Sequence, residues 1–493
     1  MQEVVIKDRK LKSGLISRAK NEPDNNNWLS HELYRCKFKD ERIGKRFRTL
    51  LEQLWNGIGE SIPFACQDWA NTKAAYRFFS NDRVNEKEIL NGHFQSTRDR
   101  FAKTSDTVLV LQDTTEFSYE RDKPETIGAT HIIPNGLDIY GKLKRHTKCG
   151  ILMHSSLAVT TDGLPLGLAA IKFWTRKQFK GTNALKRRIN PTRVNIKEKE
   201  SYRWIESLKQ STRLLNDSSR CVHIGDRESD IYELFCTAKK VRTHFLVRTC
   251  VDRLAGDGNH TIADEIDEVK VKGLHRIQVR DKRGNVSDAV LEIKYRRIKV
   301  LPPIGKQKEY PELLLTVIHA EERGSPNNRD RIVWKLMTDL PVSSRQDAIE
   351  KLNWYAMRWR IETFHKILKS GCKAEASKLR TAERLSNLIS VFCILSWRIF
   401  WLTMINRDCP DAPPEIALTK IEINLLNKLL KYKGNITPNK RKLSDYLTGI
   451  AKLGGYLARA SDPPPGNIVM WRGLMRLMDI GLGFNLAMKI VGN

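Results

Sequence analysis

Long apolar runs are almost absent from this sequence. Only Leu388 to Ile405 approaches the roughly 20 residues that cross a bilayer, and that run includes Ser390, Ser396 and Arg398. We therefore expect a buried core helix there, and no membrane as a partner. The opening residues MQEVVIKDRKLK contain no apolar signal core, so we expect the protein in the cytoplasm.

Cysteine motifs are absent, and acidic residues are outnumbered by basic ones. The nine cysteines form no Cys-x2-Cys pair and no cluster with histidine, so we expect scattered reduced thiols and no zinc site. Lys and Arg number 86 against 57 Asp and Glu, a formal net charge of +29. Such an excess favours a polyanionic partner, and the lack of apolar runs favours nucleic acid over a membrane surface.

The chain of 493 residues is long enough for several domains, and its N-terminal part has helical patterns. Asp40 is a capping residue for a helix that runs to Trp55. Apolar residues recur in it at helical spacing, at Ile43, Phe47, Leu50, Leu51 and Leu54. Asp68 to Asn81 is predicted as a further helix of the same unit.

Basic residues crowd the first turns of the helix after Asp40. They are Arg42, Lys45, Arg46 and Arg48. The positive end of the helix dipole adds to their charge, so this end of the helix can lie against phosphates. The alternative is a solvated basic face on a small helical bundle.

Two acidic residues follow short apolar runs. Val108 to Leu111 is closely followed by Asp113, and Cys221 to Ile224 is closely followed by Asp226. Such runs suit buried central strands, and ligand sites form beyond the ends of such strands. Two carboxylates of this kind, with a third from a facing helix, can hold a pair of divalent cations. The alternative is that each Asp is a turn or cap residue.

Further strands are predicted around these acids. Gly150 to Thr160 and Leu164 to Ile171 form a meander, as at the start of an RNase H-like sheet. A basic, irregular segment from Arg176 to Arg213, with a helix from Glu198 to Leu208, suits contact with a nucleic-acid backbone. Between Thr243 and Asp339 the apolar period is mostly two. It predicts strands at His275 to Val279, Asp288 to Tyr295, Leu313 to His319 and Ile332 to Met337.

The segment Asn353 to Lys369, NWYAMRWRIETFHKILK, combines an acid, several cations and aromatic rings. On one continuous helix, its polar groups fall within an arc of about 80°, with Trp359 beside them. These groups belong to Tyr355, Arg358, Glu362, Lys366 and Lys369. Such a face suits an anionic ligand. The alternative is a solvated face in which Glu362 pairs with Lys366, a contact worth about 0.2–0.5 kcal/mol.

Three segments together resemble a known family. VLVLQDTT, VHIGDRESD and YAMRWRIETFHKILK, in this order, are similar to the bacterial cut-and-paste DDE transposases of the insertion-sequence-four (IS-four) family, especially the branch of the transposon-five (Tn-five) transposase. The family's Tyr-x2-Arg-x3-Glu-x6-Lys signature is matched by Tyr355, Arg358, Glu362 and Lys369. The AAYRFF, EKES and LGGY segments extend the likeness over nearly all of the chain.

The resemblance implies a catalytic triad. Asp113, Asp226 and Glu362 match the metal-binding acids of an RNase H-like domain, with two Mg²⁺ ions per site for which Mn²⁺ substitutes. One ion would activate water to nick the transposon end, and the other would stabilise the leaving 3′ oxygen. The freed 3′-OH would form a hairpin with the opposite strand, water would reopen the hairpin, and the 3′-OH would then join target DNA.

The resemblance also implies DNA contacts. The residues expected at phosphates of the transposon end, with Lys366 as an addition by position, are Tyr355, Arg358, Lys366 and Lys369. Trp334 matches the indole on which a flipped base stacks, and Trp359 matches the one that enters the vacated space. The implied partners are double-stranded DNA with inverted-repeat ends, target DNA and a second copy of the chain, in a homodimer that cleaves each end in trans. The protein would be nucleoid-associated when bound to DNA.

The implied architecture is an α/β protein of three domains. Residues 1–80 would form a helical domain that binds the DNA end. Residues 81–407 would form the RNase H-like catalytic domain, with a β-rich insertion at about 250–340, and residues 408–493 a helical dimerisation domain. Asp462 to Gly466 predicts a helix break before a last helix, Met470 to Phe484. The N-terminal region and the segment after Arg176 match the family loosely, so the sequence does not give the DNA end that is read.

Two other functions stay open. The chain could be a catalytically silent DNA-binding regulator of transposition, or an RNase H-like nuclease that cuts without joining. The intact triad and the full N-terminal region weigh against the first, and the β-rich insertion and C-terminal helices weigh against the second. Metal-dependent cleavage separates the first alternative from a transposase, and joined DNA separates the second.

Overall fold

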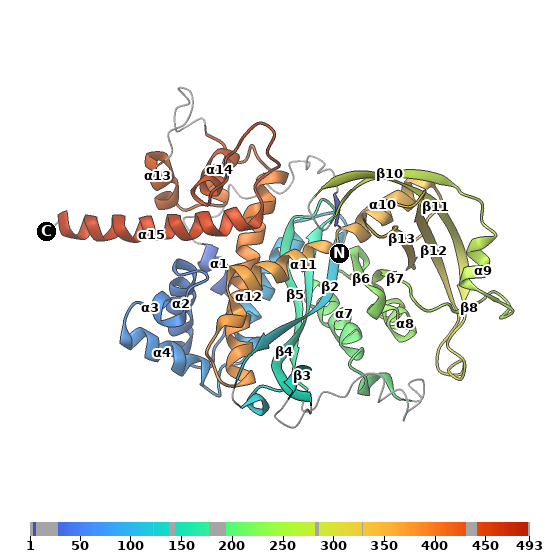
Figure 1. Cartoon of the computed structure of the whole chain (residues 1–493), viewed down its shortest axis with the longest axis horizontal. Coiled ribbons are helices and arrows are strands. Elements are labelled where there is room, and N and C mark those ends of the chain that lie inside the picture. Colours follow the sequence, from blue (N-terminus) through green and yellow to red (C-terminus); the bar gives the residue numbers. More distant parts are fainter. Residues whose placement is uncertain are drawn as a thin grey trace.

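The computed structural model describes residues 3–5, 28–121, 123–137, 143–176, 194–281, 285–327, 329–429 and 441–491. It is a mixed α/β structure in which an N-terminal helical region and C-terminal helices flank a large mixed sheet (Figure 1). Most of the basic segment predicted after Arg176, residues 177–193, lies outside the described residues.

The N-terminal helices pack around the apolar stripe predicted after Asp40. They are α1 (Trp28–Leu33), α2 (Glu41–Asn56), α3 (Ile62–Cys66), α4 (Trp69–Phe79) and α5 (Glu86–Ala102). Asp40 caps α2 by accepting a hydrogen bond from the backbone N–H of Arg42, and Asp68 caps α4 in the same way through Asn71. Phe47 of α2 stacks on Phe78 of α4, with ring centroids 5.7 Å apart. Both predicted helices are confirmed.

The sheet has a parallel centre and antiparallel flanks. Its first strands are β1 (Glu3–Val5), β2 (Val108–Tyr119), β3 (Ala129–Leu137), β4 (Leu143–Thr160), β5 (Pro165–Trp174), β6 (Cys221–Gly225) and β7 (His244–Arg248). Strands β2, β6 and β7 pair in parallel, whereas β4 pairs antiparallel with β2, β3 and β5. The predicted meander of β4 and β5 beside β2 is therefore confirmed.

Strand β2 is longer than expected. The apolar run was predicted to end at Leu111, but β2 continues through Asp113 to Tyr119 and stays paired with β4 along this length. Only its parallel pairing with β6 stops at Leu111. Asp113 therefore lies inside a strand, at the point where one neighbouring strand has ended. The β-branched and aromatic residues that follow Asp113 favour this continuation.

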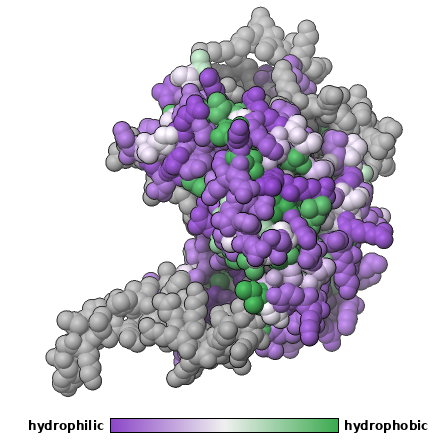
Figure 2. Space-filling view, turned by 90° about the vertical axis from the view of Figure 1, so that its right-hand side faces the viewer, coloured by the Kyte–Doolittle hydropathy of each residue, from purple (hydrophilic) through white to green (hydrophobic). Residues whose placement is uncertain are grey.

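The β-rich block extends the same sheet beyond β7. Its elements are β8 (Leu254–Ala255), β9 (His260–Thr261), α9 (Ile262–Asp267), β10 (Gly273–Arg280), β11 (Val286–Val300), β12 (Leu313–Glu322) and β13 (Val333–Thr338). The order β7-β13-β12-β11-β10-β1 is antiparallel throughout. All four strands predicted here are confirmed. Figure 2 shows that the surface over this block is largely hydrophilic, with small separate hydrophobic patches.

Helices cover both faces of the sheet. On one side, α7 (Tyr202–Leu215) and α8 (Tyr232–Val241) enclose a core with residues such as Phe245 and Val247 of β7. Leu246, between them, joins the larger core on the opposite face. The helix predicted from Glu198 begins later, because Ile196–Glu198 forms a separate 3₁₀ turn.

The longest apolar helix runs through the larger core. It is α12 (Ala382–Asp408). By length and composition alone it could cross a membrane, but 94% of its apolar window is buried inside the protein. The prediction of a core helix at Leu388 to Ile405 is confirmed. All nine cysteines, each in the described part of the chain, are free thiols.

The segment Asn353 to Lys369 is not one helix. Helix α10 (Arg345–Ala356) ends before Met357, α11 (Trp359–Lys366) follows, and Ile367–Gly371 is a π-helical turn. At the junction, the backbone N–H groups of Arg358 and Arg360 bond to carbonyls three residues earlier. These tighter turns and the wider π turn change the angle between successive side chains. The single-helix prediction was therefore wrong, and the 80° arc does not apply.

The C-terminal helices are α13 (Lys420–Leu429), α14 (Leu443–Leu453) and α15 (Asn467–Val491). Helices α14 and α15 pack closely through glycines, since a Cβ added to Gly473 would lie 1.8 Å from the carbonyl oxygen of Ile450. The predicted break at Asp462 to Gly466 is confirmed, and the last helix begins directly after it. The end of α15 projects beyond the other elements in Figure 1.

Candidate functional site

Three acidic side chains from distant parts of the chain lie close enough to interact electrostatically. Asp113 lies on β2, opposite Ser155 of β4. Asp226 follows the last residue of β6, and Glu362 lies on α11. The charges of Glu362 and Asp226 both act on Asp113. The site therefore forms where the parallel pairing of β2 and β6 ends and α11 crosses the sheet.

Asp113 is the most perturbed of these acids. Its side chain is 17% exposed, and its Oδ1 accepts a 2.8 Å hydrogen bond from the backbone N–H of Thr114. Burial raises the pKa of Asp113 to about 7; Arg358 opposes this change, whereas Glu362 and Asp226 add to it. Burial also raises the pKa of Glu362. The carboxylates thus repel one another in a partly desolvated site.

Arg358 provides the positive charge among these acids. It is 8% exposed, and its Nη2 lies 2.7 Å from Glu362 Oε1 while its Nη1 lies 3.8 Å from Asp113 Oδ2. Its guanidinium lies 4.8 Å from the centre of the Trp359 ring. Burial raises the pKa of the Tyr355 phenol, and the positive charge of Arg358 opposes this change.

The carboxylate oxygens suit a hard divalent cation such as Mg²⁺. Their repulsion, which Arg358 only partly compensates, would be relieved by a bound cation. Within the residues that the structure describes, however, no three His, Cys, Asp or Glu side chains are close enough to ligate one ion. Arg358 lies among these side chains, paired with Glu362 and close to Asp113.

The other predicted residues near the site differ in accessibility. Trp334, on β13, is only 8% exposed, and its ring meets that of Tyr355 edge to face at 5.4 Å. Lys366 is exposed. Lys369 lies in the π turn, with its Nζ 5.6 Å from the centre of the Phe117 ring of β2. Trp334 is therefore a packing partner of Tyr355 in this structure, and its indole is not open to a base.

The predicted basic residues of α2 form a second region, away from the carboxylates. Arg42 and Lys45 are exposed. Arg46 instead donates to the side-chain and backbone oxygens of Asn71, at 2.8 and 2.7 Å. Arg46 thus joins α2 to α4, which leaves Arg42 and Lys45 as the more accessible cations.

Residues 25–84 match the family model of the transposase DNA-binding domain. The matched segment includes α1 to α4 and the basic start of α2. This finding supports a transposase, and DNA as its partner. The match ends before β2, so it does not cover the three carboxylates.

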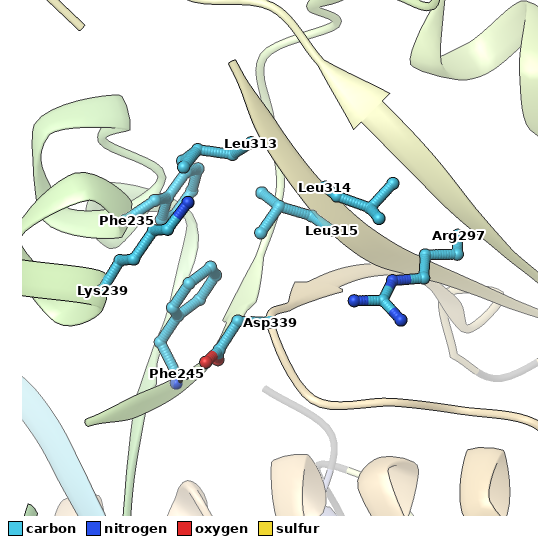
Figure 3. Close-up of a pocket in the computed structure, with 8 residues that line it drawn as sticks. All are labelled: Phe235, Lys239, Phe245, Arg297, Leu313, Leu314, Leu315 and Asp339. Carbon is cyan, nitrogen blue, oxygen red and sulfur yellow. Dashed lines mark hydrogen bonds between the residues drawn. The ribbon is translucent and has the colours of Figure 1, made fainter. Parts of the chain in front are cut away.

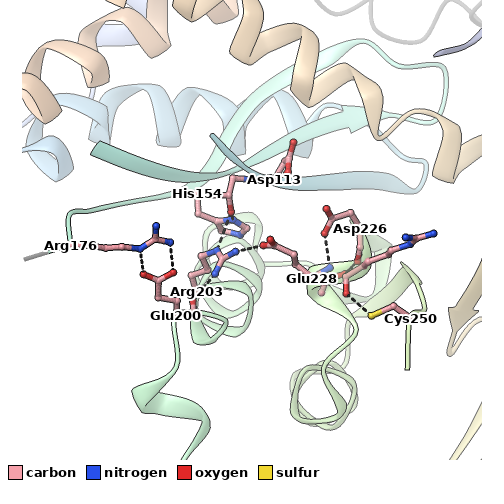
Figure 4. A network of polar contacts seen from close by, with 11 residues as sticks. Asp113, His154, Arg176, Glu200, Arg203, Asp226, Glu228 and Cys250 are labelled. Carbon is pink, nitrogen blue, oxygen red and sulfur yellow. Dashed lines mark hydrogen bonds and ion pairs between the residues drawn. The ribbon is translucent and has the colours of Figure 1, made fainter. Parts of the chain in front are cut away.

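A polar network beside the carboxylates was not predicted from the sequence. Arg203 of α7 contacts Thr114 and Glu228, the neighbours of Asp113 and Asp226 in the chain (Figure 4). Arg176 forms two 2.6 Å hydrogen bonds with Glu200, next to the same network. His365 of α11 lies 2.8 Å from the hydroxyl of Ser155. The sequence contains one indication of this network: Thr114 and Glu228 stand one and two residues after the predicted acids Asp113 and Asp226.

A pocket of about 260 Å³ lies elsewhere, between α8, β7 and the β-rich block (Figure 3). Its walls are mainly apolar side chains of α8, β7 and β12. Asp339 at its edge is already occupied, because it accepts from the backbone N–H of Phe245 and lies 2.7 Å from His244 Nδ1. The lining residues are Phe235, Lys239, Phe245, Arg297, Leu313, Leu314, Leu315 and Asp339. None of them belongs to the predicted site, so the pocket is not our candidate active site.

Proposed function

We propose that this protein is a DDE transposase of the IS-four family that catalyses cut-and-paste transposition. The observation that carries the proposal is the meeting of Asp113, Asp226 and Glu362, from three separate segments, around Arg358. The transposase DNA-binding match at residues 25–84 supports it independently. Site and match together support a chain that both binds and processes DNA.

The catalytic domain is proposed to be RNase H-like. The strand order β5-β4-β2-β6-β7 supports this assignment, since an antiparallel meander is extended by two parallel strands. Asp113 stands on β2, and Asp226 directly follows the neighbouring strand β6. We propose residues 81–407 as this domain, with the β-rich block as its insertion, after a DNA-end-binding domain at residues 1–80.

Asp113, Asp226 and Glu362 are the proposed catalytic residues and would hold two Mg²⁺ or Mn²⁺ ions. When bound, these ions supply an activated water or 3′-OH nucleophile and charge stabilisation of the leaving oxygen. Arg358 compensates the carboxylates in the free protein, and bound ions would take over part of this compensation and free Arg358 from Glu362. Its guanidinium is then available to a DNA phosphate. The Tyr355 hydroxyl and the ammonium groups of Lys366 and Lys369 would fix the same strand, because positioning supplies much of the rate in phosphoryl transfer.

The two tryptophans are proposed to stabilise a distorted DNA end. Trp359 is partly exposed and could enter a base stack, whereas Trp334 must first lose its contact with Tyr355 to receive a flipped base. Stacking on an aromatic ring contributes about 1–3 kcal/mol, which offsets part of the unpairing required for a hairpin. Movement of Tyr355 toward a phosphate would free Trp334.

The C-terminal helices are proposed to join two subunits. Apolar side chains of α15 stay exposed near its end, including Leu486 at 61% and Ile490 at 75%. Exposed apolar residues of this kind favour contact with another protein surface. A homodimer would present two catalytic sites, each able to cleave the end held by the partner subunit.

Reaction products distinguish the proposal from its alternatives. Purified protein is incubated with DNA that carries the inverted repeats flanking its gene, together with a target plasmid, in Mg²⁺ and in Ca²⁺. Hairpin intermediates and inserted products with Mg²⁺ alone are the expected result. Cleavage without insertion would instead indicate a nuclease, and binding without any cleavage would indicate a regulator.

A further inference from the structure

Arg203 lies at the centre of the polar network beside the proposed catalytic acids. It belongs to the first turn of α7 and is 8% exposed. Its Nη1 donates to the carbonyl oxygen of Glu200 at 2.9 Å. Its guanidinium also lies 5.5 and 5.9 Å from the ring centres of Trp174 and Trp204. These contacts hold the Arg203 guanidinium in a position with little access to water. Its hydrogen bonds are stronger there than those of a solvent-exposed cation.

One branch of the network leads from Arg203 to Asp113. The Nε–H of Arg203 donates to Thr114 Oγ1 at 3.0 Å, and the Thr114 hydroxyl lies 2.9 Å from His154 Nδ1. Burial lowers the pKa of His154 well below its usual value, so a neutral ring shares this hydrogen bond with Thr114. The backbone N–H of Thr114 in turn holds Asp113 Oδ1. The Thr114 hydroxyl is thus hydrogen-bonded to both Arg203 and His154, while the Thr114 backbone N–H orients the Asp113 carboxylate.

The second branch leads from Arg203 to Asp226. The Nη2 of Arg203 pairs with Glu228 Oε2. The backbone N–H of Glu228 donates to Asp226 Oδ1 at 2.9 Å, which caps the 3₁₀ turn after β6. Figure 4 shows Arg203 between the two branches, with Glu228 reaching toward it from the Asp226 turn.

We propose that Arg203 is a positioning residue that holds Asp113 and Asp226 in register for metal binding, through Thr114 and Glu228. One planar guanidinium reaches both neighbours at once, which the point charge of a lysine cannot do. The strands carry the two acids to the same edge, and Arg203 fixes the two backbone N–H groups that orient their oxygens. The inference rests on the proposed function, since it assigns a role to residues around the proposed metal ligands.

Mn²⁺ affinity tests this role without a catalytic assay. The full chain is titrated with Mn²⁺, and free Mn²⁺ is followed by electron paramagnetic resonance. Removal of a group that orients metal ligands typically weakens binding about 10–100-fold, and we expect this from Arg203→Gln. Arg203→Lys should recover only part of the affinity. Glu228→Gln, whose side chain is 62% exposed, serves as a second variant that should fold normally.

The two variants together test whether the contacts act as one unit. If Arg203 works through Glu228, the double variant Arg203→Gln/Glu228→Gln should bind Mn²⁺ about as weakly as Arg203→Gln alone. Additive losses would contradict the proposed path. Arg220→Gln is the matched control, because Arg220 pairs with Asp217 at 2.7 Å and bonds to the Thr104 carbonyl, but stands before β6. It should bind Mn²⁺ as the wild type does.

The outcomes separate this inference from the proposed function. No Mn²⁺ binding by the wild type would overturn the metal site and the inference with it. Normal binding by the wild type together with unchanged binding by Arg203→Gln would overturn the inference alone. An equal loss in Arg203→Gln and Arg220→Gln would also overturn it, since both would then act only on the stability of the fold.

Discussion

Arg358 is a buried cation with two carboxylate neighbours, so its shape matters as much as its charge. Lysine would keep the charge but cannot reach Glu362 and Asp113 with separate nitrogens. We expect Arg358→Lys to lower the rate of end nicking by about 100-fold, the cost of a misplacement of about 1 Å. DNA-end binding, measured by gel shift, should change little because the residues matched by the DNA-binding domain are intact.

Arg360 gives the control for this variant. It lies in the first turn of α11, two residues after Arg358, but contacts Met404 and the carbonyl of Asp162 instead of the acids. Arg360→Lys should therefore nick DNA at the wild-type rate. If both lysine variants lost the same activity, a general disturbance of α11 would explain the result and the role assigned to Arg358 would be wrong.

The cations of α2 should differ in their effect on DNA binding. Arg42 and Lys45 are exposed, whereas Arg46 is bonded to Asn71. Each phosphate contact that is lost lowers the salt dependence of the binding constant by about one unit of log–log slope. Arg42→Gln and Lys45→Gln should each do so in a salt titration. Arg46→Gln should leave the slope unchanged and lower the free energy of unfolding instead; the reverse pattern would contradict this assignment.

At the scale of elements, a buried ion pair joins the N-terminal helices to the sheet. Glu32 of α1 lies 2.6 Å from Arg100 Nη1 and 2.5 Å from His93 Nδ1, both on α5. The other ring nitrogen of His93 accepts from the backbone N–H of Leu168 on β5. Burial alone would raise the pKa of Glu32, but chiefly the charge of Arg100 lowers it from 4.5 to about 2.

This pair predicts a pH-dependent stability. Glu32→Gln leaves Arg100 without its buried partner, so at pH 7 the free energy of unfolding should fall by about 3–5 kcal/mol. Because the folded-state pKa of Glu32 is depressed, the ionic stabilisation is complete above pH 4.5 and is lost as the pH falls toward 2. Urea unfolding should show wild type and variant converging over this range.

An exposed pair provides the comparison. Arg35 and Asp99 lie 3.3 Å apart with side chains 46% and 49% exposed, so Asp99→Asn should cost less than about 1 kcal/mol. A difference between wild type and Glu32→Gln that did not shrink below pH 4.5 would contradict the role of the Glu32 charge.

Local pattern predicted most of the elements, because their signals were local. The apolar stripe and Asp40 cap located α2, and the period of two located β10 to β13. The longer β2 also had a local signal, in the β-branched and aromatic residues Thr114, Thr115, Phe117 and Tyr119. Asp113 instead suggested that its strand ends there. In the structure, only the neighbouring strand β6 ends at this level.

The features that were missed depend on tertiary contacts. Asn353 to Lys369 contains no Pro or Gly, so nothing in the sequence marked the break between α10 and α11. There, buried Arg358 pairs with Glu362, while Tyr355 packs on Trp334 of β13, the strand that precedes α10. The bond between Arg203 and Thr114 spans 89 residues. The sequence could therefore indicate which acids lie near one another in the fold, but it could not indicate the side chains that orient these acids.

At the scale of the whole molecule, the exposed end of α15 predicts assembly. Replacing Leu486 and Ile490 by serine should leave the fold intact, because both side chains face solvent at 61% and 75%. The double variant should prevent formation of a two-end, two-subunit complex on inverted-repeat DNA, as measured by analytical ultracentrifugation. Ile304→Ser, at a 77% exposed site in the β-rich block, is the control. Dimers that persist in the α15 variant would contradict the proposed interface.

The excess of positive charge, +29, makes DNA binding alone a weak test of function. A basic protein binds DNA without sequence preference through its phosphates. A test of catalysis must therefore show that the reaction depends on Asp113, Asp226 and Glu362. A variant with the same charge change at another site is the control.

The most direct measurement is Mg²⁺-dependent nicking of an inverted-repeat end by Asp113→Asn, Asp226→Asn and Glu362→Gln. Glu350→Gln is the matched control, because Glu350 is an acid of the preceding helix that pairs with Lys351 instead of the triad. We predict that each triad variant binds the DNA end but loses nicking by at least about 1,000-fold, while Glu350→Gln nicks normally. Nicking that survives in any of the three variants would contradict the assignment of that acid, and nicking in all three would refute the catalytic site.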